Sequence, residues 1–387
     1  MFFLAFIDEL WTYRLQTAPN AKYSLTNITS KRSIMGNIFS STQQRFELLP
    51  NQQRLESLPN EVLIEIFQYI DSINLRSFKG LNKRIDLIIE SLKINVKVHW
   101  MPKLNTTFLS TFKPSQIIRL EMRSHWFSMN LTSMMKLRSL ILDCSYLSRD
   151  QLDQMSTITL CYLERLSVHN TTPDLQKLLL DTIFRGEHFP LLKICQLKLK
   201  YTHDLKLNDN NPLPNNTVRS LTINNKWSWH ELESLLHRLP HLRRLETNIG
   251  ESYPMSVTSI NPHLSIKHLR ITLNKPSDDL KTLLKLTPNL VRLRIRGSLK
   301  NISALEHFKE ITKVLSDLVP RLQYFDCELY CYSCEDDKAL TIRCLHPLYR
   351  DIQRLCGQSR NQCYATDINN YPTPNEYECE YFDETVF

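Results

Sequence analysis

Basic side chains recur at alternate positions of short segments in the carboxyl-terminal half of the sequence, and their chemistry is that of anion recognition. The residues concerned are Arg244, His268, Arg270, Arg292, Arg294 and Arg296. The planar guanidinium group of arginine pairs with a carboxylate or a phosphate through two parallel hydrogen bonds. The spacing therefore predicts a binding site for an acidic or phosphorylated protein segment. The alternative is a solvated basic face without a dedicated ligand.

A cluster of cysteines near the end of the chain raises the question of a metal. Cys331 and Cys334 have the spacing of half a zinc site, and Cys344 with His346 is a candidate for the other half. The chain has no second Cys-x-x-Cys pair, and Cys327 falls on an expected strand, where cysteine is a small buried hydrophobe. We therefore expect no metal and no cofactor.

Catalytic motifs are not readable in this sequence. His230-Glu231 resembles the start of a metalloprotease motif, but the next histidine is His237, seven residues on, where that chemistry needs a spacing of four. The six glycines of the chain form no phosphate-binding loop. We therefore expect a protein that is not an enzyme.

The elements that position the basic residues follow from a repeated pattern, apolar-x-x-apolar-x-apolar. Its middle positions include Leu197, Leu221, Leu245, Leu269 and Leu293, which are 24 residues apart. A constant spacing in this range predicts stacked units, each with one short strand and one helix. Further units are expected from residue 105 to residue 330, with middle positions at Leu120, Leu140, Leu166 and Phe325. Because side chains alternate along a strand, the basic residues between the buried ones should share one face.

Helix starts within the repeats are also readable. Ser228 followed by Glu231, and Ser303 followed by Glu306, have the spacing of capping boxes.

A different pattern occupies the segment before the repeats. Proline at Pro59 is suited to a helix start, and Leu63, Ile66, Phe67 and Ile70 recur on one helical face. A second short helix is expected around Leu75 and Phe78, and a third from Leu81 to Leu92. Three helices within roughly 40 residues bury only a small core, so part of their apolar surface should await a partner.

This segment resembles an F-box. The matching elements are Leu58-Pro59-x-Glu61, Ile66-Phe67, Asp71, Leu75, Leu81 and Lys83-Arg84, while Asn82 stands where a serine is common and Ile85 where a tryptophan is frequent. The resemblance implies docking onto the Skp adaptor, and through it the cullin, of a ubiquitin ligase. The positions expected to contact or support the adaptor are Leu58, Pro59, Leu63, Ile66, Phe67, Leu75 and Leu81.

The repeated units resemble the leucine-rich repeat family. The two resemblances together imply an α/β fold in which a three-helix F-box is followed by a leucine-rich-repeat solenoid, with parallel strands on the concave face and helices on the convex face. They imply four regions: an extension at 1–54, the F-box at 55–95, the repeats at 105–330 and a carboxyl-terminal cap with an acidic tail at 331–387. The implied function is substrate recognition for an SCF-type ubiquitin ligase. The alternative is a repeat-based protein-binding scaffold whose first helices only cap the array.

Composition restricts the other function classes. The chain has 387 residues and a formal net charge of +8, which raises nucleic-acid binding, but no recognition helix or aromatic-interleaved basic ribbon favours it, and no nucleic-acid partner is expected. No apolar window is long enough to span a bilayer. The irregular spacing of the ten cysteines favours reduced thiols in the cytoplasm or nucleus.

The two ends of the chain carry separate features. Met35-Gly36 fits a myristoylation signal only if translation begins at Met35 rather than Met1. After Arg360 there is no lysine or arginine, while acidic and aromatic residues accumulate. We expect this acidic tail to be able to fold back onto the basic face and compete with a partner, so that its deletion tightens partner binding at low salt. A solvated terminus is the alternative.

Overall fold

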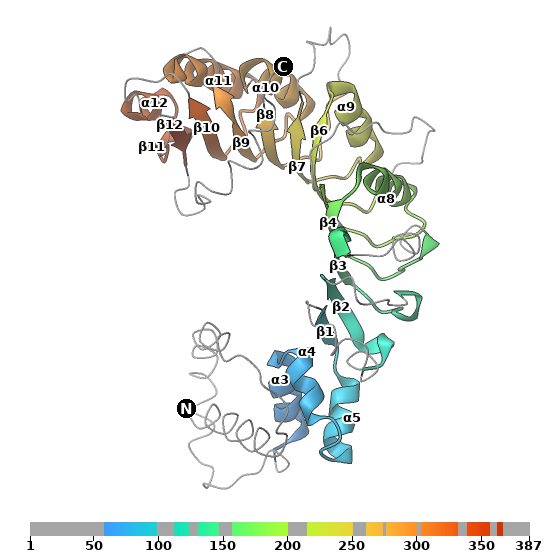
Figure 1. Cartoon of the computed structure of the whole chain (residues 1–387). Coiled ribbons are helices and arrows are strands. Elements are labelled where there is room, and N and C mark those ends of the chain that lie inside the picture. The colour runs from blue at the N-terminus through green and yellow to red at the C-terminus, as the bar shows by residue number, and fades with distance from the viewer. Residues whose placement is uncertain are drawn as a thin grey trace, which may run out of the picture. The chain divides into compact units, whose positions relative to one another are not determined.

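The computed structural model is a mixed α/β protein built on one long sheet (Figure 1). It describes residues 58–98, 112–123, 131–146, 157–199, 215–250, 261–273, 276–299, 303–331, 339–356 and 362–366. The chain divides into two compact units, Met1–Leu63 and Ile64–Phe387. The possible start at Met35, the zinc candidate Cys334 and the acidic tail lie outside the described residues. No helix within the described ranges is long and apolar enough to cross a membrane.

Helices occupy the positions where the sequence predicts them before the repeats. They are α3 (Asn60–Tyr69), α4 (Ser72–Leu75), the 3-10 turn η3 (Arg76–Phe78) and α5 (Lys83–Ser91). Asp71 caps α4 by accepting a hydrogen bond from the Asn74 backbone amide at 2.9 Å. The Asn82 side chain caps α5 in the same way, at 2.9 Å from the Ile85 amide. Asparagine at this position therefore performs the capping that a serine would perform.

A sheet of twelve strands follows, in the order β1-β2-β3-β4-β5-β6-β7-β8-β9-β10-β12-β11. The first ten strands are all parallel and pair in chain order. Their bounds are β1 Ile94–Val98, β2 Ile117–Met122, β3 Ser139–Asp143, β4 Arg165–Thr171, β5 Ile194–Leu199, β6 Ser220–Trp227, β7 Arg244–Ile249, β8 His268–Leu273, β9 Arg292–Leu299 and β10 Tyr324–Cys331. Strand β1 was not expected from the sequence, which placed the repeats from residue 105.

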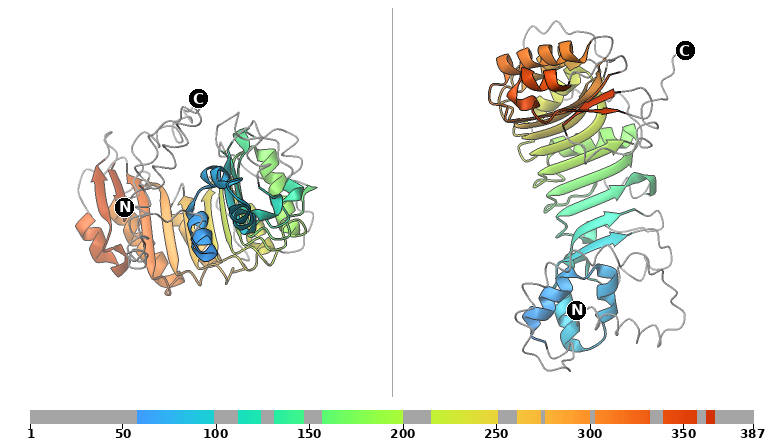
Figure 2. Two further views of the ribbon diagram at one scale, coloured as in Figure 1. Left: turned by 90° about the horizontal axis from the view of Figure 1, so that it is seen from below. Right: turned by 90° about the vertical axis from the view of Figure 1, so that its left-hand side faces the viewer.

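The helices that follow strands lie on one face of the sheet, and the other face carries none of the labelled helices (Figures 1 and 2). They are α8 (Pro173–Arg185), α9 (Trp229–Arg238), α10 (Pro276–Leu286) and α11 (Ala304–Leu318). We call the uncovered side the open face. Short 3-10 turns occupy Pro114–Gln116 (η4), Leu131–Ser133 (η5) and Cys144–Tyr146 (η6).

One of the two predicted capping boxes is present and the other is absent. The Ser228 hydroxyl accepts a hydrogen bond from the Glu231 amide, and the Glu231 carboxylate accepts one from the Ser228 amide at 3.1 Å. Ser303 precedes α11 but makes no side-chain cap, and the Glu306 carboxylate pairs with Lys309 at 2.8 Å. The prediction for Ser303 was therefore wrong.

The core consists of the leucine positions of the repeats, aligned strand by strand. Leu221, Leu245, Leu269 and Leu293 are direct partners on neighbouring strands and are at most 2% exposed. On β5, however, the partner of Leu221 is Cys195, and Leu197 pairs with Ile223. The predicted register of this unit was therefore wrong by two residues, and the buried series continues through Leu192, Cys195 and Leu197.

The carboxyl-terminal end of the sheet changes direction. Strand β12 (Gln362–Ala365) pairs antiparallel with β10, and β11 (Gln353–Cys356) pairs antiparallel with β12. The connecting segment holds α12 (Ala339–Leu345) and η7 (Pro347–Tyr349). Tyr349 closes this end of the core, with ring centroids 5.3 Å from Phe308 and 5.1 Å from Phe325.

Candidate binding surface

The residues predicted to contact the adaptor differ in their exposure. Leu63, Phe67 and Leu75 are at most 2% exposed and belong to the core. The Phe67 and Phe78 rings pack with centroids 5.3 Å apart. Pro59 is exposed, Leu58 and Ile66 are half-buried, and Leu81 is 50% exposed. Of the seven, the buried three therefore support the helices in this structure, and the others remain available to solvent.

The helices before the sheet retain further apolar surface. Tyr69 is 59% exposed and Leu87 is 68% exposed. Together with Leu81 they place large apolar groups in water on α3, on α5 and on the turn between η3 and α5. Such groups are compatible with a protein partner, although single exposed apolar residues are common on any surface.

The open face of the sheet carries the predicted basic residues. Arg244, His268 and Arg292 are cross-strand partners in one row, and Glu246, Arg270 and Arg294 form the next row. Between the rows lie the buried leucines, so the alternation expected from the sequence is present. Arg296 lies two residues beyond Arg294 on the same strand. The structure therefore brings all six predicted side chains onto neighbouring strands.

Carboxylates from the same and neighbouring strands share this face. Arg270 pairs with Glu246 at 3.1 Å, Arg292 with Asp326 at 2.8 Å, and Arg296 with Glu328 at 3.0 Å. Arg292 donates to the Asp326 carboxylate through both Nε and a terminal nitrogen. Three of the predicted arginines are therefore already matched with a carboxylate of the protein itself.

Two further arginines of the open face differ from these three in their ion pairing. Neither Arg244 nor Arg294 forms an ion pair with a described residue. The pKa of Arg270 is lowered by burial, an effect partly offset by Glu246, and the nearby charges of Arg294 and Arg296 lower it further. Arg244 and Arg294 are therefore the arginines of the set that an external anion can reach without displacing a described carboxylate.

A serine and a histidine lie within hydrogen-bonding distance at the middle of the sheet. Ser167 Oγ is 2.9 Å from His169 Nε2, and it donates to Gln196 Oε1 at 3.1 Å. A hydroxyl has one proton, so the imidazole must donate to Ser167 rather than accept from it. The pKa of His169 is lowered by burial and by the charges of Lys198 and Arg123. This arrangement orders the open face and does not activate Ser167 as a nucleophile.

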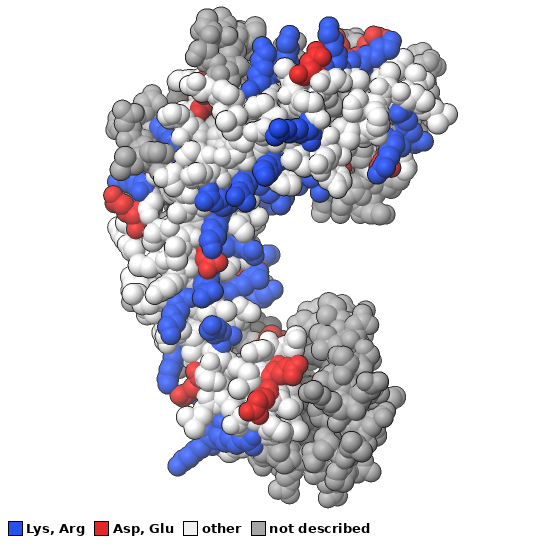
Figure 3. Space-filling model, turned by 180° about the vertical axis from the view of Figure 1, so that it is seen from behind, with Lys and Arg blue, Asp and Glu red and all other residues white. Residues whose placement is uncertain are grey.

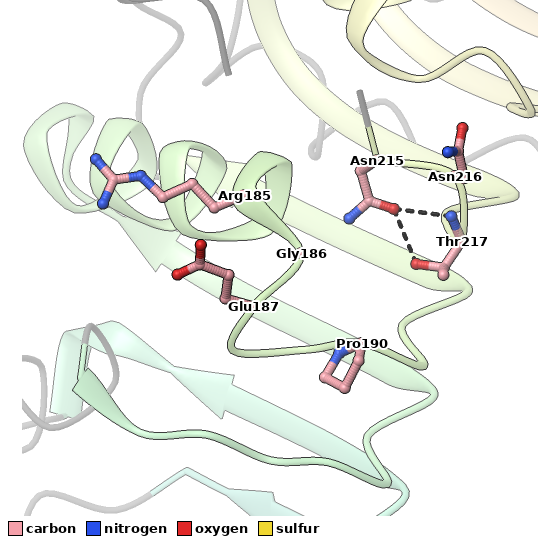
Figure 4. A pocket seen from close by; sticks show the side chains of 7 residues that line it. All are labelled: Arg185, Gly186, Glu187, Pro190, Asn215, Asn216 and Thr217. Carbon is pink, nitrogen blue, oxygen red and sulfur yellow. Dashed lines mark hydrogen bonds between the residues drawn. The ribbon is translucent and has the colours of Figure 1, made fainter. Parts of the chain in front are cut away.

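A pocket of about 280 Å³ lies at the carboxyl end of α8 (Figure 4). Gly186 ends the helix with a φ of +70°. Asn215 crosses to the helix end, where its amide donates to the Ile183 carbonyl at 2.6 Å, and its Oδ1 accepts from the Thr217 amide and hydroxyl at 2.8 Å. The Asn215 side chain uses both its donor and its acceptor in these bonds, so it acts as a structural junction between the end of α8 and the next repeat.

Of the metal candidates, Cys334 lies outside the described residues. His346 Nδ1 accepts a hydrogen bond from the Leu348 amide at 3.2 Å and so caps η7. Cys344 is exposed, and Cys327 is buried on β10. Within the described ranges, no three histidine, cysteine or acidic residues are grouped in a way that could hold a metal ion.

These features define the class of the protein: a repetitive α/β protein with a long, mostly parallel sheet, helices on one face and a charged open face. No protein-family model matches the chain, and no curated protein matches it. The chain is similar to a crystal structure of a protein from Bacteroides fragilis, with 13% sequence identity over 80% of each chain and a TM-score of 0.31. A likeness at that TM-score carries no argument about function.

Proposed function

We propose that this protein is the substrate receptor of an SCF-type ubiquitin ligase, in which an F-box binds a Skp adaptor and leucine-rich repeats bind the target. The sequence motif from Leu58 to Arg84 supports the first part. The observation that carries it is that Leu81, a motif position, is a large apolar side chain left half-exposed on the turn before the last helix of the segment. A partner that covers Leu81 would gain about 25 cal/mol for each Å² of apolar surface removed from water.

The receptor contributes proximity rather than chemistry. A target held on the repeats and an adaptor held on the helices become parts of one assembly, which raises the effective concentration of target lysines near the ligase. The catalytic residues belong to other subunits of the ligase.

The target site that we propose is the open face at Arg244, His268, Arg270, Arg292, Arg294 and Arg296, and the target is an acidic or phosphorylated protein segment. An anion can bind Arg294 directly, whereas it must displace Glu246 or Glu328 to reach Arg270 or Arg296. Arg294→Glu should therefore weaken capture of an acidic target more than Arg270→Glu does.

Adaptor capture tests the first part of the proposal. The full chain is purified with a Skp adaptor, and Leu81→Asp is compared with Leu340→Asp, which makes the same change at a leucine that is 74% exposed on α12. We expect the wild-type chain and Leu340→Asp to retain the adaptor and Leu81→Asp to lose it. Capture that fails for the wild-type chain, or that survives Leu81→Asp, refutes the ligase assignment.

A second candidate is a repeat-based binding scaffold without a ligase role. The specific observation in its favour is the junction between the helices and the sheet. The Gln116 side chain is buried and donates to the Ile89 carbonyl at 2.8 Å and to the Leu92 carbonyl at 3.3 Å. This bond fixes the end of α5 to the start of β2, as a cap on the first strands would require. An adaptor-negative chain that still binds an acidic protein supports this candidate.

A further inference from the structure

The residues immediately before strands β3 to β10 form a regular backbone ladder along the side of the sheet on which these strands begin. We refer to this side as the edge of the sheet. Each of these residues donates its amide to the carbonyl of the member before it, except the first, Arg138, which donates to the Ile118 carbonyl; all these distances are 2.8–2.9 Å. We call this series the strand-start column; its members are Arg138, Glu164, Lys193, Arg219, Arg243, Lys267, Val291 and Gln323. Neighbouring members are held at the separation of adjacent strands, about 4.8 Å.

Four consecutive members of the column are basic. Lys193, Arg243 and Lys267 are exposed, and Arg219 is half-buried. Figure 3 shows this side of the molecule, where lysine and arginine side chains form a band along successive strands. Neither Arg219, Arg243 nor Lys267 has an ion pair with a described residue. The column therefore carries positive charge that no described carboxylate offsets.

The column already contains one carboxylate that is paired with its basic members. Its one acidic member, Glu164, lies 3.9 Å from Arg138 on one side and 3.8 Å from Lys193 on the other. An acidic side chain is thus bracketed by cations from the neighbouring layers. The same backbone hydrogen bonds join the four basic members from Lys193 to Lys267, and no acidic member of the column lies between them.

The field at this edge reaches the adjoining row of the open face. The pKa of His268 is lowered, first by burial and then by the charges of Arg244, Arg292 and Lys267. The part of this lowering that comes from the three cations reflects a positive electrostatic potential at His268. An anion bound at the column would reduce that potential.

The sequence contains a segment of opposite charge, and Thr366, the described residue that precedes it, is bonded to β10. Residues 367–387 include no lysine or arginine; their acidic members are Asp367, Glu376, Glu378, Glu380, Asp383 and Glu384. The chain enters this segment from Thr366, which donates its amide to the Cys327 carbonyl on β10 at 3.2 Å. Since β12 runs antiparallel to β10, the chain advances there toward Tyr324, at the amino end of β10. That end of the strand is the edge that carries the column.

The distances allow the segment to cover the basic members. From the start of β10 to the start of β6 there are four strand spacings, about 19 Å. The 21 residues of 367–387 span up to about 70 Å when extended. An attached segment of this length acts at an effective concentration of the order of millimolar.

We propose that the acidic segment 367–387 binds the strand-start column at Arg219, Arg243 and Lys267. The binding site is the edge of the sheet rather than the arginines of the open face, most of which are matched by Glu246, Asp326 and Glu328. This inference does not depend on adaptor binding, and it is tested on the isolated full chain without any partner.

Zero-length carbodiimide coupling of carboxylates to lysines tests the proposal on the full chain in dilute solution at low salt. We expect a link between Lys267 and an acidic residue of 367–387, identified by mass spectrometry after digestion. The exposed lysines of α10, Lys281 and Lys285, serve as internal controls and should remain without such links. A mixture of isotopically labelled and unlabelled chains shows whether the link is within one chain.

Two double variants distinguish the column from the open face. Arg219→Gln with Arg243→Gln removes two column charges and should lower the yield of the Lys267 link about fivefold, because each exposed charge contact contributes modestly. Arg294→Gln with Arg296→Gln changes the open face and should leave the yield unchanged. The proposal is overturned by links that form mainly between chains, by equal labelling of Lys281, by a column variant without effect, or by loss of the link in the open-face variant alone.

Discussion

Asn215 links the end of α8 to the start of the next repeat, and its replacement tests the structural account of the pocket in Figure 4. Its side chain is 5% exposed. It donates to the Ile183 carbonyl and accepts from the Thr217 amide and hydroxyl and from the Val218 amide, the last at 3.3 Å. Asn215→Ala removes all four hydrogen bonds without changing the backbone.

The expected loss follows from which partners can reach water. Thr217 is half-buried, so its groups can be hydrated after the substitution. The Ile183 carbonyl keeps a hydrogen bond from the Gly186 amide at 3.1 Å, whereas the amide of the fully buried Val218 would be left unpaired. An unpaired buried polar group costs about 1–3 kcal/mol, so with one such group Asn215→Ala should lower the free energy of unfolding by about 2 kcal/mol.

Urea unfolding followed by circular dichroism measures this difference. Asn216→Ala is the matched control, because Asn216 is exposed and a surface substitution changes stability by about 0.5 kcal/mol or less. If Asn215→Ala and Asn216→Ala unfold at the same urea concentration, the interpretation of this junction is wrong.

Three further predictions concern local chemistry. Burial lowers the pKa of His263, so the folded state favours the neutral imidazole. Its contribution to the free energy of unfolding is therefore fully present above the unfolded pKa of about 6.5 and is lost as the pH falls below that value. His263→Gln should reduce the difference between the urea midpoints at pH 8 and pH 5.5. Burial raises the pKa of the Cys195 thiol to about 12, so native protein treated with iodoacetamide should be labelled at the exposed Cys344 and not at Cys195; equal labelling contradicts the burial. Ser228→Ala removes the cap of α9 and should lower the free energy of unfolding by about 1 kcal/mol, while Glu231→Ala should cost less; no change on thermal unfolding would contradict the capping geometry.

The repeat spacing located most of the strands correctly because each unit buries the same apolar positions. Leu221, Leu245, Leu269 and Leu293 are in register as the spacing of 24 residues predicts. The spacing failed at Leu197, because the step from β5 to β6 is longer and the sequence contains an equally good apolar pattern two residues away. A shift of two residues keeps every side chain on its face, so alternation alone cannot detect it.

Strand β1 was missed for a different reason. Ile94, Val96 and Val98 alternate with polar residues as a strand requires, but the segment is short and lies outside the repeat spacing. Its pairing with β2 supplies the stability that five residues cannot supply alone. The placement of the basic residues on the open face followed from alternation, whereas their pairing with Glu246, Asp326 and Glu328 required the neighbouring strands.

Most of the strand-start column was readable in the sequence, since its members follow the first apolar residue of their units, as Arg243 follows Leu242 and Lys267 follows Ile266; Lys193 was not, because its unit was predicted two residues out of register. That pattern becomes a surface only when the strands stack in register and the backbone ladder aligns residues that are 24 or more positions apart. The sequence by itself determined the apolar periodicity, the helix caps at Asn82 and Ser228, and the excess of basic side chains, because these depend on near neighbours in the chain. Only the tertiary structure decided which charges are matched and which remain unpaired, because ion pairing depends on side chains that the fold brings together from different repeats.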